Sequence, residues 1–218
     1  MKWLITALAF IGIIAAGCST SFITSSWKSD SIPAPSYKKI LVLGLIGDPD
    51  RAVREKMEEH IAGDLRDLGY SAICACQEYE PKTFAGMNEN QAVEKIMNDG
   101  YDAVVTVVLL NKTKERVYAP GRIEPGSQAG QQQKFWQYYS STYDRVYQAG
   151  YYSIETNYFW ETNLYDLKSS SLVYSAQSQS FDPESSDKLG HEYGIMIVKD
   201  MVKKEVLIKK EKETPKAF

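Results

Sequence analysis

Three apolar runs in the first half of the chain predict β-strands. Residues 39–45 form a nearly continuous apolar run, which is typical of a strand that is covered on both faces. Residues 72–76 give a shorter strand signal, and residues 102–110 give the strongest one in the chain. We therefore expect residues 102–110 to form the central strand of a sheet.

Two helices are predicted between these strands. The first begins at Asp48 and Pro49, with Asp48 as the cap and Pro49 at the first helical position. Its apolar stripe at helical spacing comprises Val53, Met57, Ile61, Leu65 and Leu68. The second helix covers residues 88–99, where Asn88 and Gln91 match a capping box. Because crossovers between parallel strands are right-handed, this order predicts a small three-stranded parallel sheet with helices covering it.

The second half of the chain follows a different pattern. Residues 111–150 are rich in Tyr, Gln and Gly, and we interpret them as an insertion loop. Residues 152–166 and 172–181 have the alternation of strands and are joined by a serine-rich turn, which predicts an antiparallel hairpin. A final helix is expected after Asp182 and Pro183. Its apolar face comprises Leu189, Tyr193, Ile197 and Met201.

Together these elements predict an α/β (α+β) fold. The three-stranded parallel sheet is extended by the antiparallel hairpin, and a C-terminal helix follows. We expect one α/β domain over residues 37–208 and a frayed, charged tail over residues 209–218.

A short apolar segment at the amino terminus has the layout of a secretory signal peptide, which we place at residues 1–17. It is shorter than the span of about 20 apolar residues that a transmembrane helix needs. The motif Ala15-Ala16-Gly17-Cys18 resembles the bacterial lipobox. This resemblance implies that the leader is cleaved and that the Cys18 thiol is acylated. The alternative is an ordinary cleaved signal with an incidental cysteine.

Residues 18–36 are rich in Ser and Thr and are interpreted as the lipidated cysteine and a tether, which reaches at most about 60 Å when fully extended. Phe22, Ile23 and Trp27 interrupt its polar character, so part of the tether could dock on the domain as an edge strand. Ser19 follows the cysteine. By resemblance to the sorting rule of Gram-negative lipoproteins, this favours the outer membrane, with the protein facing the periplasm.

The net charge narrows the classes of partner that the protein is expected to bind. The formal net charge of −3 and the absence of a long basic run make nucleic acid an unexpected partner.

Besides Cys18, the chain has Cys74 and Cys76, which we expect on one strand. Residues two apart on an extended strand are too far apart for undistorted disulfide geometry, so two packed thiols are favoured. A strained disulfide, an intermolecular bridge and a metal site remain the alternatives.

The most unusual composition is an aromatic cluster in the second half of the chain. Tyr and Trp combine a large contact area with a polar tip, so such clusters suit glycan or peptide surfaces. The candidate surface for a ligand or partner comprises Trp136, Tyr139, Tyr143, Arg145, Tyr147 and Tyr151. The alternative is that these rings cover an exposed face or edge of the sheet.

No local motif predicts catalysis, a metal or a cofactor. Gly44 and Gly47 lie between a strand and a helix, but their spacing matches no phosphate loop, and a plain tight turn is expected. His60 and His191 have no second ligand at metal-binding spacing, so each is predicted to be a surface or boundary residue. A catalytic triad assembled from distant residues would leave no such local signature, so these absences lower the expectation of an enzyme without removing it.

The chain resembles a family of Gram-negative bacterial lipoproteins of unknown function. The residues that carry the resemblance are the lipobox, Trp27, the strand at 39–45, the Tyr118-x-Pro120 segment and the hairpin from Leu164 to Tyr174. At the level of the fold, the strand and helix order also looks similar to the amino-terminal domains of TolB-type and curli-secretion envelope proteins.

The expected function is that of a membrane-anchored, periplasm-facing lipoprotein that acts as a non-catalytic binding or assembly module of the cell envelope. Its expected partners are the membrane, through the lipid anchor, and peptidoglycan or an envelope protein. The alternatives are an exported enzyme that acts on envelope glycan or peptide and an accessory subunit of a secretion or fibre-assembly complex.

Overall fold

The computed structural model describes residues 20–30, 37–80, 82–119 and 151–210, together with Phe135, Trp136, Tyr139 and Tyr143. The predicted signal peptide, Cys18 and the last eight residues therefore lie outside the described residues. Within the described residues, no helix has the length and apolar composition needed to cross a membrane.

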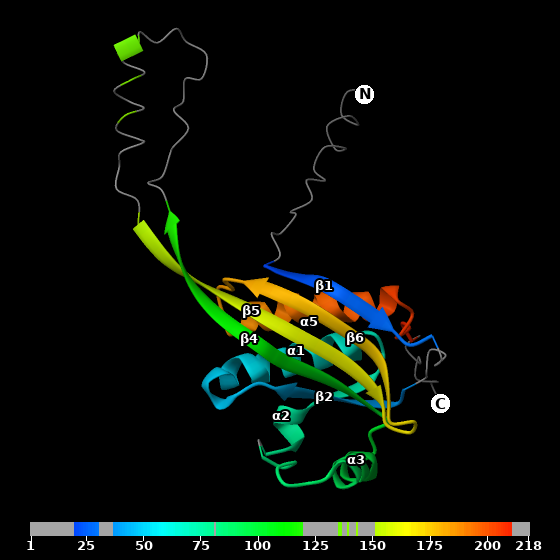
Figure 1. The fold of residues 1–218 in the computed structure, drawn as a ribbon. Coiled ribbons are helices and arrows are strands. Elements are labelled where there is room, and N and C mark those ends of the chain that lie inside the picture. The colour runs from blue at the N-terminus through cyan, green and yellow to red at the C-terminus, as the bar shows by residue number, and fades with distance from the viewer. Residues whose placement is uncertain are drawn as a thin grey trace, which may run out of the picture.

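The fold is a six-stranded mixed sheet in the order β1-β6-β5-β4-β2-β3 (Figure 1). The strands are β1 (Ser21–Lys28), β2 (Lys39–Leu45), β3 (Ser71–Cys74), β4 (Ala103–Ala119), β5 (Tyr151–Asp166) and β6 (Ser171–Phe181). The helices are η1 (Asp48–Asp50), α1 (Arg51–Asp67), α2 (Ala75–Glu78), α3 (Glu89–Asn98) and α5 (Ser186–Lys203). The strand β2 runs parallel to both β3 and β4, whereas all other pairs are antiparallel. The predicted mixed α/β architecture is confirmed, including the central position of β4.

Helices cover the two faces of the sheet unequally. The long helices α1 and α5 pack side by side on one face, where they enclose the main core (Figure 1). Every residue of the predicted stripe on α1 is buried except Leu68, which is half-buried, and the predicted apolar face of α5 is buried throughout. The short helices α2 and α3 cover the other face only at the parallel strands β2, β3 and β4, through a smaller cluster that includes Leu41, Ile96 and Val104.

A buried aromatic and polar network joins the antiparallel hairpin to α5. The Trp160 ring stacks on Tyr158 with 5.4 Å between ring centroids and meets Tyr193 edge-on at 5.7 Å. Its indole N–H donates to Ser180 Oγ at 3.2 Å. The Tyr193 hydroxyl lies 2.8 Å from Thr162 Oγ1, so the polar atoms of this core have partners.

Four predicted boundaries are corrected. Asp48 is not a helix cap, because η1 begins there with Gly47 in front of it and α1 follows from Arg51. The last helix begins later than predicted, and Ser185 caps it by accepting from the Lys188 backbone N–H at 3.1 Å. Gly44 lies within β2 and not in a tight turn. The charged tail is fixed at Lys210, whose backbone N–H donates to Leu68 O at 2.8 Å.

Two segments that the sequence predicted as tether and loop contain strands. In the predicted tether, Ser21–Lys28 forms β1, which pairs with β6. It is an edge strand, in agreement with the expectation that the apolar residues of this segment could dock on the domain. In the predicted loop, residues 111–119 continue β4 and pair with β5 up to the Ala119–Tyr151 pair. This outer part of β4 and β5 is a two-stranded ribbon that projects from the helix-covered body (Figure 1). Because no helix of the described ranges 37–80, 82–119 and 151–210 covers it, this ribbon does not need the apolar alternation by which strands are recognised.

Candidate functional site

The structure divides the predicted aromatic surface. Trp136, Tyr139 and Tyr143 lie on the segment between β4 and β5, are exposed, and form a chain of rings. The ring centroids of Trp136 and Tyr139 are 5.6 Å apart, and those of Tyr139 and Tyr143 are 5.8 Å apart. Tyr151 is exposed at the start of β5. Arg145 and Tyr147 lie outside the described residues. The exposed rings of this surface thus offer contact area for a ligand or partner.

The prediction of two free thiols is wrong, because the structure joins Cys74 to Cys76 in a disulfide. The prediction assumed that both residues lie on one extended strand. Instead, β3 ends at Cys74 and the helix α2 begins at Ala75, so the chain turns between the two cysteines. This turn leaves their Cα atoms 5.2 Å apart, within the range in which disulfides form.

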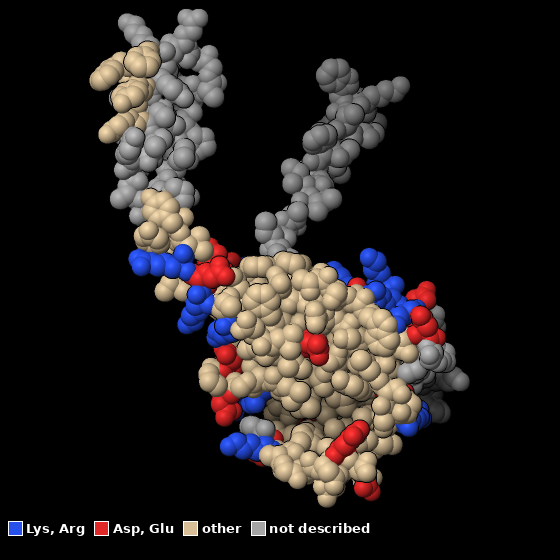
Figure 2. All heavy atoms as spheres, in the orientation of Figure 1, with Lys and Arg blue, Asp and Glu red and all other residues tan. Residues whose placement is uncertain are grey.

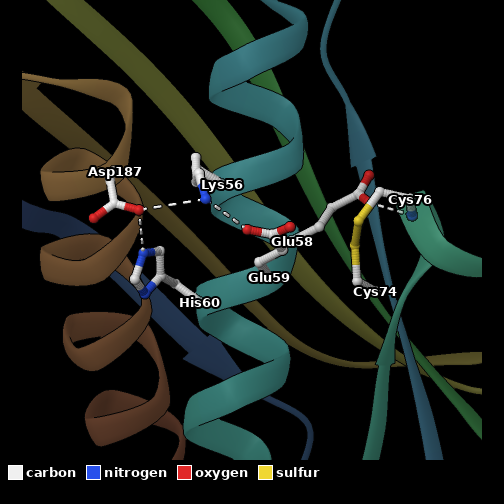
Figure 3. A network of polar contacts seen from close by, with 7 residues as sticks. All are labelled: Lys56, Glu58, Glu59, His60, Cys74, Cys76 and Asp187. Carbon is white, nitrogen blue, oxygen red and sulfur yellow. Dashed lines mark hydrogen bonds and ion pairs between the residues drawn. A yellow bond between two sulfur atoms is a disulfide. The ribbon is translucent and has the colours of Figure 1, made fainter.

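A buried carboxyl group lies against this disulfide. Glu58 projects from α1 toward the sulfur atoms, whereas its neighbour Glu59 points away to Lys56 (Figure 3). The Gly44 backbone N–H donates to Glu58 Oε1 at 2.8 Å, and the Cys76 backbone N–H donates to Glu58 Oε2 at 2.7 Å. Glu58 Oε2 also lies 3.2 Å from Cys74 Sγ. One carboxyl group thus joins α1, β2 and the turn after β3.

Glycine at position 44 makes room for this carboxyl group. A Cβ atom there would lie 2.9 Å from Glu58 Oε1 and 2.7 Å from Arg54 Cγ, which is closer than real Cβ contacts. Glu58 itself is only 2% exposed. Burial raises the pKa of the Glu58 carboxyl, while the two backbone donors and Arg54 act in the opposite direction. A proton is therefore held more readily here than on an exposed glutamate.

A small recess opens beside the carboxyl group. It has a volume of about 40 Å³, and its lining includes Cys76, Glu58 and Arg54. Cys74 does not line the recess and is 1% exposed, whereas Cys76 is half-buried. The two cysteines thus differ in access, which gives the disulfide a more exposed side at Cys76 and a buried side at Cys74.

Glu58, Cys74 and Cys76 also form a set of metal-ligating groups. One ligand atom from each lies within 4.8 Å of the other two. If the disulfide were reduced, two thiolates and a carboxylate would suit a soft or borderline cation such as Zn²⁺. In the disulfide form the sulfur atoms carry no thiolate, so the set is not a metal site in that state.

Sequence reasoning missed this site, although one signal was present. Around the circumference of α1, Glu58 falls between Ala62 and Leu65, and both of these residues are buried. An acidic residue inside the apolar arc of a helix predicts a buried carboxyl group with specific partners. The partner cysteines are separated from it in sequence and come together only through the packing of α1 against β3.

A second polar cluster brings together the two histidines, which were each predicted to be a surface or boundary residue. His60 on α1 and His191 on α5 have ring centroids 5.4 Å apart, and Asp187 Oδ1 lies 3.3 Å from His60 Nε2 (Figure 3). Lys56 reaches the same carboxylate at 3.5 Å. His191 and Asp187 are exposed, and ion pairs that are exposed to water and salt add little to stability. This cluster is therefore interpreted as a surface contact between α1 and α5.

The chain matches no protein-family model and no curated protein. Among solved structures it is similar to the PelC dodecamer from Paraburkholderia phytofirmans, with 12% identity and a TM-score of 0.43, over 87% of this chain and 99% of that one. It is also similar to lipoprotein GNA1162 from Neisseria meningitidis, with 16% identity and a TM-score of 0.40, over 76% of this chain and 99% of that one. At these values we take neither a family nor a function from them.

Proposed function

We propose that this chain is a bacterial lipoprotein, anchored through Cys18 to the outer membrane and facing the periplasm, that binds a protein partner of the cell envelope. The observation that carries the binding role is an uncovered face of the sheet. Helices cover the opposite face, and α2 and α3 reach only the parallel strands, so among the residues that the structure describes β1, β6 and β5 keep one face open (Figure 1).

The open face is aromatic and poor in charge. Phe22 and Trp27 on β1 and Phe181 on β6 are 48%, 51% and 39% exposed, and Phe22 stacks on Phe181 with 5.6 Å between ring centroids. Figure 2 shows that Lys, Arg, Asp and Glu are sparse over this part of the sheet. Exposed aromatic residues with few charges are typical of the core of a protein interface.

Two features support export and anchoring. The lipobox predicts acylation of Cys18, and disulfides such as Cys74–Cys76 persist mainly in oxidising compartments. Since β1 begins at Ser21, the free tether is much shorter than predicted. The three residues from Cys18 to Thr20 span at most about 10 Å. An acylated Cys18 would therefore hold the edge strand β1, and with it the open face, close to the membrane surface.

Crosslinking in intact cells tests the binding role. A photoactivatable amino acid is placed at Trp27 on the open face or, as the control, at Lys199, which is exposed on α5. We expect a defined crosslinked species from position 27 and none from position 199. A crosslink to a second copy of this chain would indicate assembly, which is what an accessory subunit of a larger complex would do. Equal products at both positions, or none at position 27, would contradict the proposal.

Anchoring is tested separately by membrane fractionation. We expect Cys18→Ala to move the protein from the outer-membrane fraction to the aqueous fraction, because a single unacylated segment of this length does not hold a protein in a bilayer. Cys76→Ser is the matched control, since it makes the same kind of change at a cysteine of the disulfide and leaves the lipobox intact. Retention of the Cys18→Ala variant in the membrane would contradict lipid anchoring.

A further inference from the structure

We propose that Cys74 and Cys76 form a redox-active disulfide that exchanges with a dithiol, with Glu58 as the proton donor and acceptor at Cys74 Sγ. This inference does not depend on the proposed binding function. It rests on three observations: a disulfide with one accessible and one buried side, a carboxyl group 3.2 Å from the buried sulfur, and a recess that reaches both residues.

A purely structural role explains this disulfide poorly. A disulfide stabilises a fold mainly by closing a loop in the unfolded chain, and the effect grows with loop length. Cys74 and Cys76 are separated by one residue, so the closed loop is about as short as a disulfide loop can be and the chain-entropy effect is small. The bond also joins β3 to the first turn of α2, which already follow one another along the chain. Little is gained in stability by linking two segments that the backbone already links.

The recess determines which sulfur an incoming thiol can reach. The recess is small, about 40 Å³, and it is lined by Cys76 and Glu58, so a thiol side chain that enters it meets the Cys76 side of the disulfide. Because Cys76 lines the recess and Cys74 does not, attack occurs at Cys76 Sγ and Cys74 is the leaving group.

The exchange proceeds in two steps, through a mixed disulfide between the dithiol and Cys76. A thiolate of the dithiol attacks Cys76 Sγ, so that a mixed disulfide forms and the Cys74–Cys76 bond breaks. The electron pair goes to Cys74 Sγ, which takes the proton of the Glu58 carboxyl group beside it. The second thiolate of the dithiol then displaces Cys76, which takes a proton from water. The dithiol becomes a disulfide, loses two electrons to the protein and releases two protons to water. The protein gains both cysteine thiols, one protonated by Glu58 and one by water, and Glu58 then takes a proton back from water.

Other titratable groups also face the reacting atoms. Arg54 on α1 lines the recess, and its positive charge favours a thiolate there. Glu80 and Tyr79, which follow α2, line the same recess, and Glu55 on α1 adds a further negative charge near Glu58. Of these carboxyl groups, Glu58 is the one in contact with a sulfur atom. Removal of its proton should therefore slow the exchange, because the leaving sulfur of Cys74 loses its proton donor.

The test follows reduction of the folded full-length chain by dithiothreitol, with peptide-resolved alkylation of Cys74 and Cys76 as the readout. We expect the disulfide to be reduced without unfolding, at a rate that does not change when urea is added below the unfolding transition. Below the pKa of Glu58, where its carboxyl group holds the proton, Glu58→Gln should slow reduction by about a hundredfold, the lower end of what a positioned acid or base contributes. Glu59→Gln, the same change at the adjacent residue that points away, should leave the rate unchanged.

The pH dependence keeps the proposal falsifiable if Glu58→Gln fails to fold. After correction for the thiolate fraction of dithiothreitol, the wild-type rate should fall as pH rises through the pKa of Glu58, because the leaving sulfur loses its proton donor. A corrected rate that does not change with pH, or equal rates for Glu58→Gln and Glu59→Gln, would overturn the role of Glu58. Reduction that occurs only when the protein unfolds would identify a structural disulfide and overturn the whole proposal.

Discussion

The same substitution, glycine to alanine, should have opposite effects on α5 and α1. Gly190 lies inside α5 where this helix crosses α1, and a Cβ atom there would lie 2.7 Å from the Lys56 carbonyl oxygen. Gly63 lies inside α1, and its nearest neighbour would be Arg66 Nη2 at 3.8 Å, an ordinary contact distance. We therefore expect Gly190→Ala to destabilise the protein and Gly63→Ala to stabilise it.

The magnitudes follow from two opposing effects. Alanine is favoured over glycine inside a helix by about 0.8–1 kcal/mol, which applies at both positions. At Gly190 the added methyl group would be about 0.7 Å short of the 3.4 Å at which ordinary contact begins. Its neighbour there is backbone, which cannot rotate away, so the overpacking cost lies at the upper end of about 1–3 kcal/mol. The net expectation is a loss of about 2 kcal/mol for Gly190→Ala and a gain of about 0.8 kcal/mol for Gly63→Ala.

Urea and thermal unfolding measure both variants against the wild type. For a domain of this size, 1 kcal/mol shifts the melting temperature by about 2–4 °C, so the two variants should differ by roughly 6–12 °C. Far-UV circular dichroism of the folded variants checks that the helical content is unchanged. If both variants gained the same stability, α5 would not pack on α1 through Gly190, and the arrangement of these two helices would be wrong.

Three further predictions concern stability. Ser185→Ala removes the side chain that caps α5 and should cost about 1 kcal/mol in the free energy of unfolding, measured in urea, with Ser186→Ala as the control. Trp160→Ala empties the centre of the core and should cost about 3–5 kcal/mol by the same assay. Burial raises the pKa of Glu58 in the folded state, so stability should fall as pH rises from the ordinary glutamate range, about 4.3, through that pKa, because the folded protein binds the proton more tightly than the unfolded chain. Glu58→Gln should flatten this slope relative to the wild type. A slope of the same sign should remain in the variant, because burial also raises the pKa of Asp64.

The elements that the sequence predicted correctly are those specified by short-range interactions. The capping box of α3 forms as expected, with the Asn88 side chain accepting from the Gln91 backbone and the Gln91 side chain accepting from the Asn88 backbone. Gly69 has a positive φ of 91° directly after α1, where glycine commonly ends a helix. Such signals involve residues within one helical turn, so they can be recognised without knowledge of the fold.

The missed features depend on residues that are distant in sequence or on surroundings that the pattern does not encode. The extension of β4 beyond residue 110 is specified by its pairing with β5, and its charged residues suit a ribbon that is open to water on both sides. The Cys74–Cys76 disulfide depends on a change from strand to helix at Ala75 within a single residue, and a short apolar run does not mark that change. The contact of Glu58 with Cys74 also depends on tertiary packing, which brings the two residues together only in the folded chain.

The order of the strands separates the two proposed activities in space. The edge strand β1 carries Phe22 and Trp27 and follows the predicted anchor after a few residues, whereas Cys74 ends β3 at the opposite edge of the sheet. Five strand spacings of about 4.8 Å place the two edges roughly 24 Å apart. Because groups this far apart without shared partners act nearly independently, a partner on the open face would leave the disulfide accessible. A membrane-held partner and a dithiol could therefore engage opposite edges of the same sheet at the same time.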